Sequence, residues 1–284
     1  MHKIALLGAG GKMGFRLARN LRGTPYAVSH VEVSAEGRAR LERELGIRCV
    51  PREQALADAD FLVLAVPDAR IGTVLRECVA ELRPGTLVVI LDAAAPWAGE
   101  LPQRPDIGYF VTHPCHPPLF RQEASEAAQR DFFGGEAAAQ AIVCALAQGP
   151  EEVYARGEEL ARCMFRPVSR AHRVAVEHMA ILEPALSETV GATLVTALRE
   201  ATEEAIRRGV PRAAAMDFML GHLSIELAIL FEVFPGRFSD GALLAIETAK
   251  RTIFREGWLE RVFAPEAVKE SVVEICRAQQ GAPS

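Results

Sequence analysis

The chain has 284 residues, half of them apolar, which is enough for one large or two medium globular domains with a sizeable core. Its net charge of −5 and the lack of a basic run argue against a nucleic-acid surface. The six cysteines contain no C-x-x-C pair, so neither a disulfide framework nor a cysteine zinc site is indicated. No apolar stretch approaches the ~20 residues that span a bilayer, so we expect a cytoplasmic protein with a small-molecule partner and no membrane.

The start of the chain predicts a nucleotide-binding turn. Lys3 to Leu7 is an apolar, strand-like run, and a helical pattern follows the glycines after it. The glycines have the spacing G-x-x-G-x-x-G, and one more provides an alternative G-x-G start. Because glycine has no Cβ, a diphosphate can approach the backbone amides at the helix N-terminus. We therefore expect dinucleotide binding, with an ordinary tight turn as the alternative, by Gly8, Gly10, Gly11, Lys12, Met13 and Gly14.

Glu32 lies in the second predicted strand, Ala27 to Val33, 24 residues after Gly8. An acidic residue at about this spacing accepts hydrogen bonds from the ribose hydroxyls of NAD and repels the extra phosphate of NADP. We therefore expect NAD as the cofactor. A solvent-facing strand residue is the alternative for Glu32, and the nearby Arg38 keeps NADP open.

Two further apolar runs, 61–66 and 86–91, predict central parallel strands. Ligands of open α/β sheets lie beyond the carboxyl ends of the strands. We therefore expect the cofactor cleft to be lined by the turn after the first run, which contains Val66, Pro67 and Asp68. Asp68 and Asp92, which follows the second run, also suit helix caps, and we favour that role for both.

The densest group of reactive side chains is His113-Pro-Cys-His-Pro-Pro118, which follows a predicted strand at 108–112. Its prolines stiffen the loop and would hold His113 and His116 in fixed positions, as a metal ligand or an acid/base group requires. The alternative is two histidines that pack under a proline turn. Cys115 lacks zinc-finger spacing, so we expect it to be structural.

The chain becomes helical after two more predicted strands, 142–146 and 164–168, with a helix at 150–162 between them. A long helix at about 171–209 would reach further than one domain and bridge two. Pro184 predicts a kink or restart in this helix, flanked by Glu183 and Glu188, for which a solvated acidic pair is the simplest interpretation.

These patterns predict an α/β fold with two domains. Residues 1–170 would form a Rossmann-type doubly wound parallel sheet, and residues 171–284 an all-helical domain for substrate binding and dimerisation. The helical domain has more apolar side chains than a small cap hides, so we expect a homodimer. The apolar set is Phe218, Met219, Leu223, Leu227, Leu230 and Phe231.

The glycine spacing, the strand end Ala65-Val-Pro-Asp68, the His-Pro loop and the long helix together resemble the 6-phosphogluconate and β-hydroxyacid dehydrogenase superfamily. Within it, residues 112–120 and the helix with Glu183 and Glu188 most resemble the D-apionate oxidoisomerases. The resemblance implies an NAD-dependent oxidoreductase and isomerase that oxidises a branched sugar acid at its 2-hydroxyl and rearranges it to a 3-oxo acid, 3-oxo-isoapionate. The alternatives are a hydroxyacid dehydrogenase without rearrangement and a non-catalytic NAD-sensing module.

One departure from the superfamily concerns its catalytic lysine on the bridging helix, because no lysine occurs here between Lys12 and Lys250. A divalent metal, zinc or magnesium, would replace the lysine by lowering the pKa of the substrate hydroxyl. The arrangement also resembles ketol-acid reductoisomerases, in which acids on the equivalent helix bind the metal.

We therefore expect a catalytic set of His113, His116 and Glu188. His116 and Glu188 would bind the metal, with Glu183 as the alternate ligand, and His113 would carry the proton. The sequence leaves open whether a second subunit completes the site and which arginine binds the substrate carboxylate: Arg121, Arg170 or Arg237.

Overall fold

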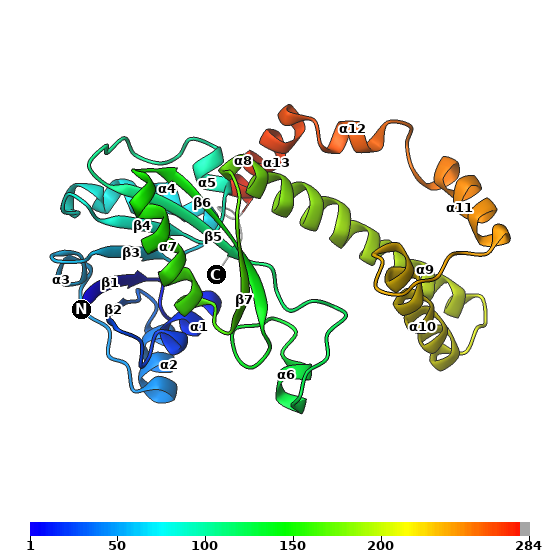
Figure 1. The fold of residues 1–284 in the computed structure, drawn as a ribbon, viewed down its shortest axis with the longest axis horizontal. Coiled ribbons are helices and arrows are strands. Elements are labelled where there is room, and N and C mark those ends of the chain that lie inside the picture. Colours follow the sequence, from blue (N-terminus) through cyan, green and yellow to red (C-terminus); the bar gives the residue numbers. More distant parts are fainter. Residues whose placement is uncertain (279–284) are drawn as a thin grey trace. The chain divides into compact units, whose positions relative to one another are not determined.

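The computed structural model describes residues 1–278 and divides into two compact units (Figure 1). Unit 1 comprises Met1–Ala180 and the last helix from Lys269, and unit 2 comprises Ile181–Val268. Unit 1 contains the sheet, and the part of unit 2 that the structure describes is helical.

Unit 1 is built on a seven-stranded sheet with the order β2-β1-β3-β4-β5-β6-β7 (Figure 1). The first five strands are parallel, which confirms the predicted Rossmann-type α/β class. The strands are β1 (His2–Leu7), β2 (Tyr26–Val31), β3 (Phe61–Leu64), β4 (Leu87–Ile90), β5 (Gly108–Pro114), β6 (Gln140–Gln148) and β7 (Val168–Arg173).

The sheet is mixed, because β6 runs antiparallel to β5 and β7 runs parallel to β6. A parallel neighbour for β5 would need a crossover connection, usually a helix packed on the sheet. Between β5 and β6 the chain forms only one short helix, α6 (Glu126–Arg130), and returns in the opposite direction.

Both faces of the sheet are buried at its centre, because every residue of β3 and β4 is buried and successive strand residues point to opposite faces. One core cluster contains Ile4, Leu6 and Val63 and the inner sides of α1 (Lys12–Asn20), α2 (Ala35–Leu45) and α7 (Glu151–Met164). The other contains Ala5, Leu7 and Leu62 and the inner sides of α3 (Arg52–Leu56) and α4 (Asp68–Cys78). Each large buried side chain contributes roughly 1.5–3 kcal/mol, so this double core fixes the strand ends that form the site. Two short helices, η1 (Val79–Glu81) and α5 (Ala94–Trp97), connect these elements.

Two predicted boundaries are wrong. A strand was expected at 164–168, but α7 continues to Met164, whose buried side chain extends the apolar stripe of that helix. The long helix was expected from about 171, but the chain up to Arg173 forms β7, and the helix begins at Val176. The largely exposed, polar pattern of β7 is typical of an edge strand and conceals its strand character in the sequence.

Helical residues continue from Val176 to Arg207 and include an irregular stretch around Pro184. The stretch η2 (Ile181–Ala192) has π-type hydrogen bonding and lies between α8 (Val176–Ala180) and α9 (Thr193–Arg207). Proline has no amide to donate to the carbonyl of Ala180, which interrupts the α-helical pattern. The hydroxyl of Thr189 instead donates to the carbonyl of Pro184 at 2.7 Å. The predicted irregularity is therefore present as a change of hydrogen-bond pattern.

Unit 2 hides little of its apolar surface. Of the 19 exposed large hydrophobic side chains among the described residues, 15 lie in unit 2. Its other helices are α10 (Arg212–Leu230), α11 (Asp240–Ile253), α12 (Trp258–Val262) and the start of α13 (Pro265–Ala278), and α11 has no buried residue.

Two helices, Val176–Arg207 and Arg212–Leu230, are long and apolar enough to cross a membrane. The sequence analysis expected none. Length and composition alone do not place a helix in a bilayer, and the first of the two carries Glu183 and Glu188.

Candidate active site

Three glycines shape the loop between β1 and α1. Gly8 has φ +76°, and a Cβ there would lie 2.3 Å from the carbonyl oxygen of Ala65. A Cβ on Gly14 would lie 2.0 Å from the carbonyl oxygen of Gly8, and one on Gly10 would lie 2.6 Å from Cα of Gly37. At Gly11 the nearest atom would be 3.4 Å away. The first three positions therefore require glycine for close packing, whereas Gly11 does not.

This loop lies at the topological switch point of the sheet. The chain places β2 on one side of β1 and β3 on the other, so the strand order reverses between β1 and β3. Open α/β sheets bind ligands at such a point, beyond the carboxyl ends of the strands. The glycine loop follows β1, and Val66, Pro67 and Asp68 follow β3. The fold thus brings together two predicted cofactor segments at the N-terminus of α1, where amides attract a diphosphate.

The Glu32 carboxylate faces the glycine loop. The amide of Gly10 donates to Oε2 and the amide of Ser34 to Oε1, each at 2.8 Å. A carboxylate has about four acceptor sites, so Glu32 retains capacity for ribose hydroxyls. Nη1 of Arg38 donates to the carbonyls of Glu32 and Val33 at 3.0 and 2.7 Å, which holds this basic group on the backbone.

The aspartates that follow β3 and β4 differ. Oδ1 of Asp92 accepts the amide of Ala94 at 2.6 Å, so Asp92 binds the first amide of α5, although the N-cap residue of that helix is Ala93. Asp68 is the first residue of α4, whose N-cap is Pro67, so the expected capping role of Asp68 is wrong. Its negative charge in the first turn still interacts favourably with the helix dipole.

His113 lies at the end of β5, beside the end of β4. Its Nδ1 is 2.8 Å from the carbonyl oxygen of Leu91. The ring is therefore the donor at Nδ1, and in the neutral form Nε2 keeps its lone pair. Burial lowers the pKa of His113 below its usual 6.5, although the Leu91 hydrogen bond and the charge of Asp92 act in the opposite direction. The neutral ring is the form that binds a metal or accepts a proton.

Asp92 and His113 form a pair that the sequence analysis missed. A carboxylate oxygen of Asp92 and a ring nitrogen of His113 lie within 4.8 Å of each other. A signal was present, because both residues directly follow predicted strands, 86–91 and 108–112. That these strands are neighbours follows only from the sheet order.

His116 is held in an unusual backbone conformation, with φ 60°. Its Nδ1 is 2.8 Å from the carbonyl oxygen of Phe133, and its ring packs on the Phe133 ring at a centroid distance of 4.7 Å. The rings of His113 and His116 are perpendicular, with centroids 6.4 Å apart. Both imidazoles thus have Nδ1 on a backbone carbonyl, which in the neutral ring places the lone pair on Nε2.

Glu183 and Glu188, the predicted metal ligands on the helix, both lie in η2. In an α-helix with 3.6 residues per turn, residues five apart point to different sides. Bonding from residue i to i+5, as in η2, turns residues five apart closer to a common side than an α-helix does. Glu183 is half-buried and Glu188 is exposed, and their role as metal ligands stays a prediction.

Arg121 binds the backbone at the end of α6. Its Nη2 donates to the carbonyls of Ala128, Gln129 and Asp131 at 3.2, 2.9 and 3.2 Å, and its side chain is 13% exposed. Its donors are therefore occupied by backbone. Arg170 and Arg237 are exposed and stay candidates for the substrate carboxylate.

Comparisons with known proteins identify relatives over nearly the whole chain. Residues 121–276 match the family model of the phosphogluconate dehydrogenase (decarboxylating) C-terminal domain, and residues 3–96 match that of NADP oxidoreductase, coenzyme F420-dependent. The D-apionate oxidoisomerase of Cupriavidus necator is 53% identical over 273 residues, which cover 96% of this chain and 99% of that protein. The D-apionate oxidoisomerase of Rhizobium rhizogenes is 52% identical over 275 residues, which cover 97% and 100%.

A solved structure from Cupriavidus necator is similar along its whole length. It is described as a semialdehyde dehydrogenase NAD-binding protein in complex with calcium and NAD. Its TM-score is 0.95 at 52% identity, and the match covers 97% of this chain and 99% of that chain.

Proposed function

Because this chain belongs to the D-apionate oxidoisomerase family, we propose that it oxidises D-apionate, or a similar branched sugar acid, at the 2-hydroxyl with NAD and rearranges it to 3-oxo-isoapionate. The observation that carries the proposal is the identity above one half with two relatives of that name over nearly the full length of both chains. The enzyme would be an NAD-dependent oxidoreductase that acts on a CH–OH group.

The glycine loop, the turn after β3 and Glu32 fit NAD. Gly8, Gly10 and Gly14 keep the backbone compact at the N-terminus of α1, and the carboxylate of Glu32 is held beside that loop. When bound, NAD supplies the hydride acceptor. The negative charge of Glu32 would disfavour the 2′-phosphate of NADP. The NAD in the Cupriavidus necator structure supports this choice.

Asp92 and His113 fit a divalent metal, because a carboxylate oxygen and an imidazole nitrogen are ligands that zinc and several other divalent ions accept. When bound, the cation supplies positive charge that favours an ionised substrate hydroxyl and polarises a carbonyl. We place these two residues first as ligands, in preference to the expected pair of His116 and Glu188. Glu188, with Glu183 as its alternate, stays the predicted carboxylate from the helix, and zinc or magnesium the predicted metal.

His116 would then be the group that moves protons. Oxidation at C2 requires the 2-hydroxyl to lose its proton as the hydride leaves. The rearrangement requires the 3-hydroxyl to lose its proton, a carbon substituent to move from C3 to C2, and the C2 oxygen to gain a proton. A neutral imidazole with its proton on Nδ1 has a lone pair on Nε2 that can accept and return a proton in these steps. His113 is the alternative proton carrier.

The decisive experiment identifies the carbon skeleton of the product. Purified protein is incubated with D-apionate and NAD, NADH is measured by absorbance, and the product is analysed by ¹³C NMR. One NADH for each rearranged 3-oxo acid is the expected result. An unrearranged oxo acid would indicate a plain hydroxyacid dehydrogenase, and NAD binding without turnover of any sugar acid would indicate an NAD-sensing module.

The oligomeric state and the location of the protein are also part of the proposal. The 15 exposed large hydrophobic side chains of unit 2 support a homodimer that covers them, in the cytoplasm. Whether the second subunit completes the active site is part of the same question.

A further inference from the structure

Phe133 connects helix α1 with His116. The Phe133 carbonyl oxygen is 2.8 Å from Nδ1 of His116, and the Phe133 ring packs on the same imidazole. On that ring also lie the guanidinium of Arg16, with Cζ 3.5 Å from the centroid, and the ammonium of Lys12, at 4.7 Å. Arg16 and Lys12 both belong to α1, whose N-terminus forms the glycine loop. One aromatic residue therefore joins the cofactor helix to the candidate proton carrier.

The backbone after Phe133 is fixed independently of its ring. The carboxylate of Asp131 accepts hydrogen bonds from four amides, those of Gly134, Glu136, Ala137 and Ala138. Arg19 donates to the carbonyl of Gly135 at 3.1 Å and forms an ion pair with Glu136 at 3.0 Å. These contacts hold only the backbone, whereas the Phe133 ring is held by its packing on His116 and by the cations of Arg16 and Lys12 over it.

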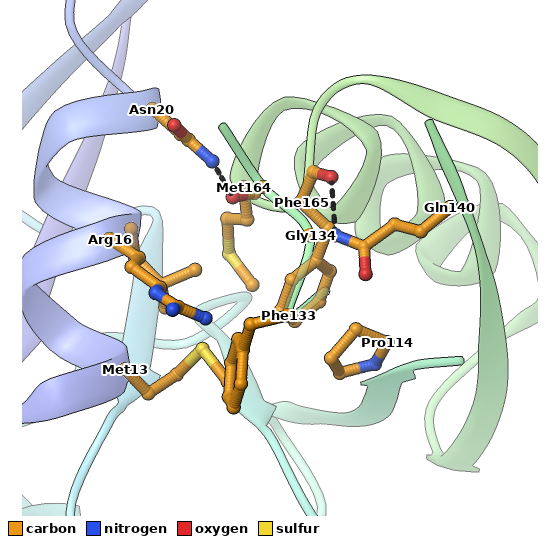
Figure 2. Close-up of a pocket in the computed structure, with 11 residues that line it drawn as sticks. Met13, Arg16, Asn20, Pro114, Phe133, Gly134, Gln140, Met164 and Phe165 are labelled. Carbon is orange, nitrogen blue, oxygen red and sulfur yellow. Dashed lines mark hydrogen bonds between the residues drawn. The ribbon is translucent and has the colours of Figure 1, made fainter. Parts of the chain in front are cut away.

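A small pocket lies beside Phe133 (Figure 2) and is lined by Arg16 from α1 and Gln140 from β6. Gln140 is 2% exposed and donates from Nε2 to the carbonyl of Phe165 at 3.0 Å. Among the described residues, neither Oε1 of Gln140 nor Nη1 of Arg16 has a hydrogen-bond partner, although both atoms are buried. The pocket volume of about 10 Å³ is that of one water, which can accept from Arg16 and donate to Gln140.

His116 needs such support because of its backbone. A positive φ is sparsely populated by residues other than glycine, and strained residues persist only where surrounding contacts hold them. The contacts that hold the His116 ring are the carbonyl and the ring of Phe133. Loss of the Phe133 ring contact would therefore let the imidazole turn away from the fixed Phe133 carbonyl and release its Nδ1 hydrogen bond.

We propose that Arg16 is a positioning residue for His116. Arg16 holds the Phe133 ring against the imidazole, and this packing keeps Nδ1 of His116 on the Phe133 carbonyl, which the backbone contacts of Asp131 hold in place. The ring proton is thereby fixed on Nδ1, and the lone pair is on Nε2. A proton carrier and a metal ligand both need that lone pair, so the inference is the same for either role of His116. It rests on the proposed function only in treating His116 as a reacting group.

The direct test measures the tautomer. Metal-free protein with ¹⁵N-labelled histidine is studied by NMR, and the His116 signals are assigned by their loss in His116→Asn, which tolerates a positive φ. In the unaltered protein the neutral His116 ring is protonated at Nδ1, and Arg16→Met gives a mixture of both tautomers. Arg16→Lys keeps a cation over Phe133 and retains most of the Nδ1 form. Arg22→Met, which removes an exposed arginine just after α1, is the matched control. An unchanged tautomer in Arg16→Met overturns the proposal.

A kinetic test follows the same chain of contacts. Arg16→Met is expected to lower kcat about tenfold, because a displaced acid/base group loses orientation, while KM for the sugar acid changes less than about twofold. Phe133→Leu removes the ring that Arg16 holds and should lower kcat similarly. The double variant should have about the same kcat as the less active of the two single variants. Fully additive losses of kcat would overturn the proposal.

The outcome of the tautomer and kinetic tests can be distinguished from failure of the proposed function. NAD titration and thermal unfolding establish that each variant is folded. If Arg16→Met does not fold, the tautomer is measured in Arg16→Lys and Phe133→Leu. Arg16→Lys should retain most of the Nδ1 form, and Phe133→Leu should give a mixture of both tautomers. If the unaltered protein does not convert D-apionate, the proposed function fails, whereas the tautomer measurement still decides the role of Arg16.

Discussion

The backbone amide of Gly10 donates a 2.8 Å hydrogen bond to Oε2 of Glu32, so the glycine loop and the acid after β2 hold each other in place. A Cβ on Gly10 would lie only 2.9 Å from Cγ of Glu32, which shows how closely the two are packed. Glu32 is therefore part of the loop structure as well as the expected ribose acceptor.

Glu32→Ala should weaken NAD binding about tenfold, because the ribose hydroxyls lose their acceptor. It should affect NADP binding less, because the loss of the carboxylate also removes the repulsion of the extra phosphate. Isothermal titration with each cofactor measures both affinities. Glu36→Ala, in the first turn of α2, is the control for a lost acidic side chain nearby. Equal affinity of the unaltered protein for NAD and NADP would contradict the assignment.

Gly14→Ala and Gly11→Ala form a matched pair at the cofactor loop. The new methyl at position 14 would lie 2.0 Å from a backbone oxygen that cannot move easily, so a loss of roughly 1–3 kcal/mol in unfolding free energy is expected, together with loss of NAD binding. At position 11 the nearest atom would be 3.4 Å away, and stability should change by less than about 0.5 kcal/mol. Urea unfolding measures both variants, and equal stabilities would show that the loop packs differently.

Chelation should abolish turnover and leave NAD binding intact, because the proposed metal acts on substrate oxygens and not on the dinucleotide. Asp92→Asn keeps an acceptor for the Ala94 amide but loses the charge, and His113→Ala loses the nitrogen. Both should reduce the metal content found by elemental analysis.

The same assay separates the two metal assignments. His116→Ala should lower activity with metal retained if Asp92 and His113 bind the ion, and should lose the metal if the originally expected set is correct. Glu188→Gln and Glu183→Gln test the helix carboxylates in the same way. Full turnover of verified metal-free protein would disprove a metal mechanism.

His30 should make the protein less stable in acid. Burial lowers the pKa of His30 from its usual 6.5 to about 4. Between these values the unfolded chain binds a proton that the folded chain does not, so unfolding free energy falls as pH decreases below about 6.5, by up to about 1.4 kcal/mol per pH unit for one group. Burial lowers the pKa of His113 too, which adds to the slope in the same direction.

His30→Phe should flatten this slope in urea unfolding measured from about pH 7 to pH 5. His172→Phe, on the exposed side of β7, is the control. Parallel pH curves for the unaltered protein and His30→Phe would show that His30 is not a source of the acid sensitivity.

The apolar faces of unit 2 predict a dimer with about twice the 30.8 kDa mass of the chain, because symmetric pairing buries such faces. Leu244→Asp, on the unburied helix α11, should shift the mass measured by light scattering towards the monomer. Leu119→Asp, at the same 70% exposure in unit 1, should not. A monomer at micromolar concentration would contradict the dimer.

The sequence by itself determined the elements that depend on neighbours along the chain. The short apolar run, the glycine spacing and the helical pattern after it predicted β1, the glycine loop and α1, because strand, turn and helix are local properties. The missing amide of Pro184 likewise predicted the irregular helix that η2 contains.

Only the tertiary structure decided which of these elements meet. The sheet order makes β4 and β5 neighbours and so pairs Asp92 with His113, and the antiparallel return of β6 follows from a connection whose path the sequence does not specify. Phe133 reaches His116 across 17 residues because α1, through Arg16 and Arg19, packs on the loop that carries it. A periodic pattern records which side of an element is buried, but the partner of that side is set by the packing of the whole core.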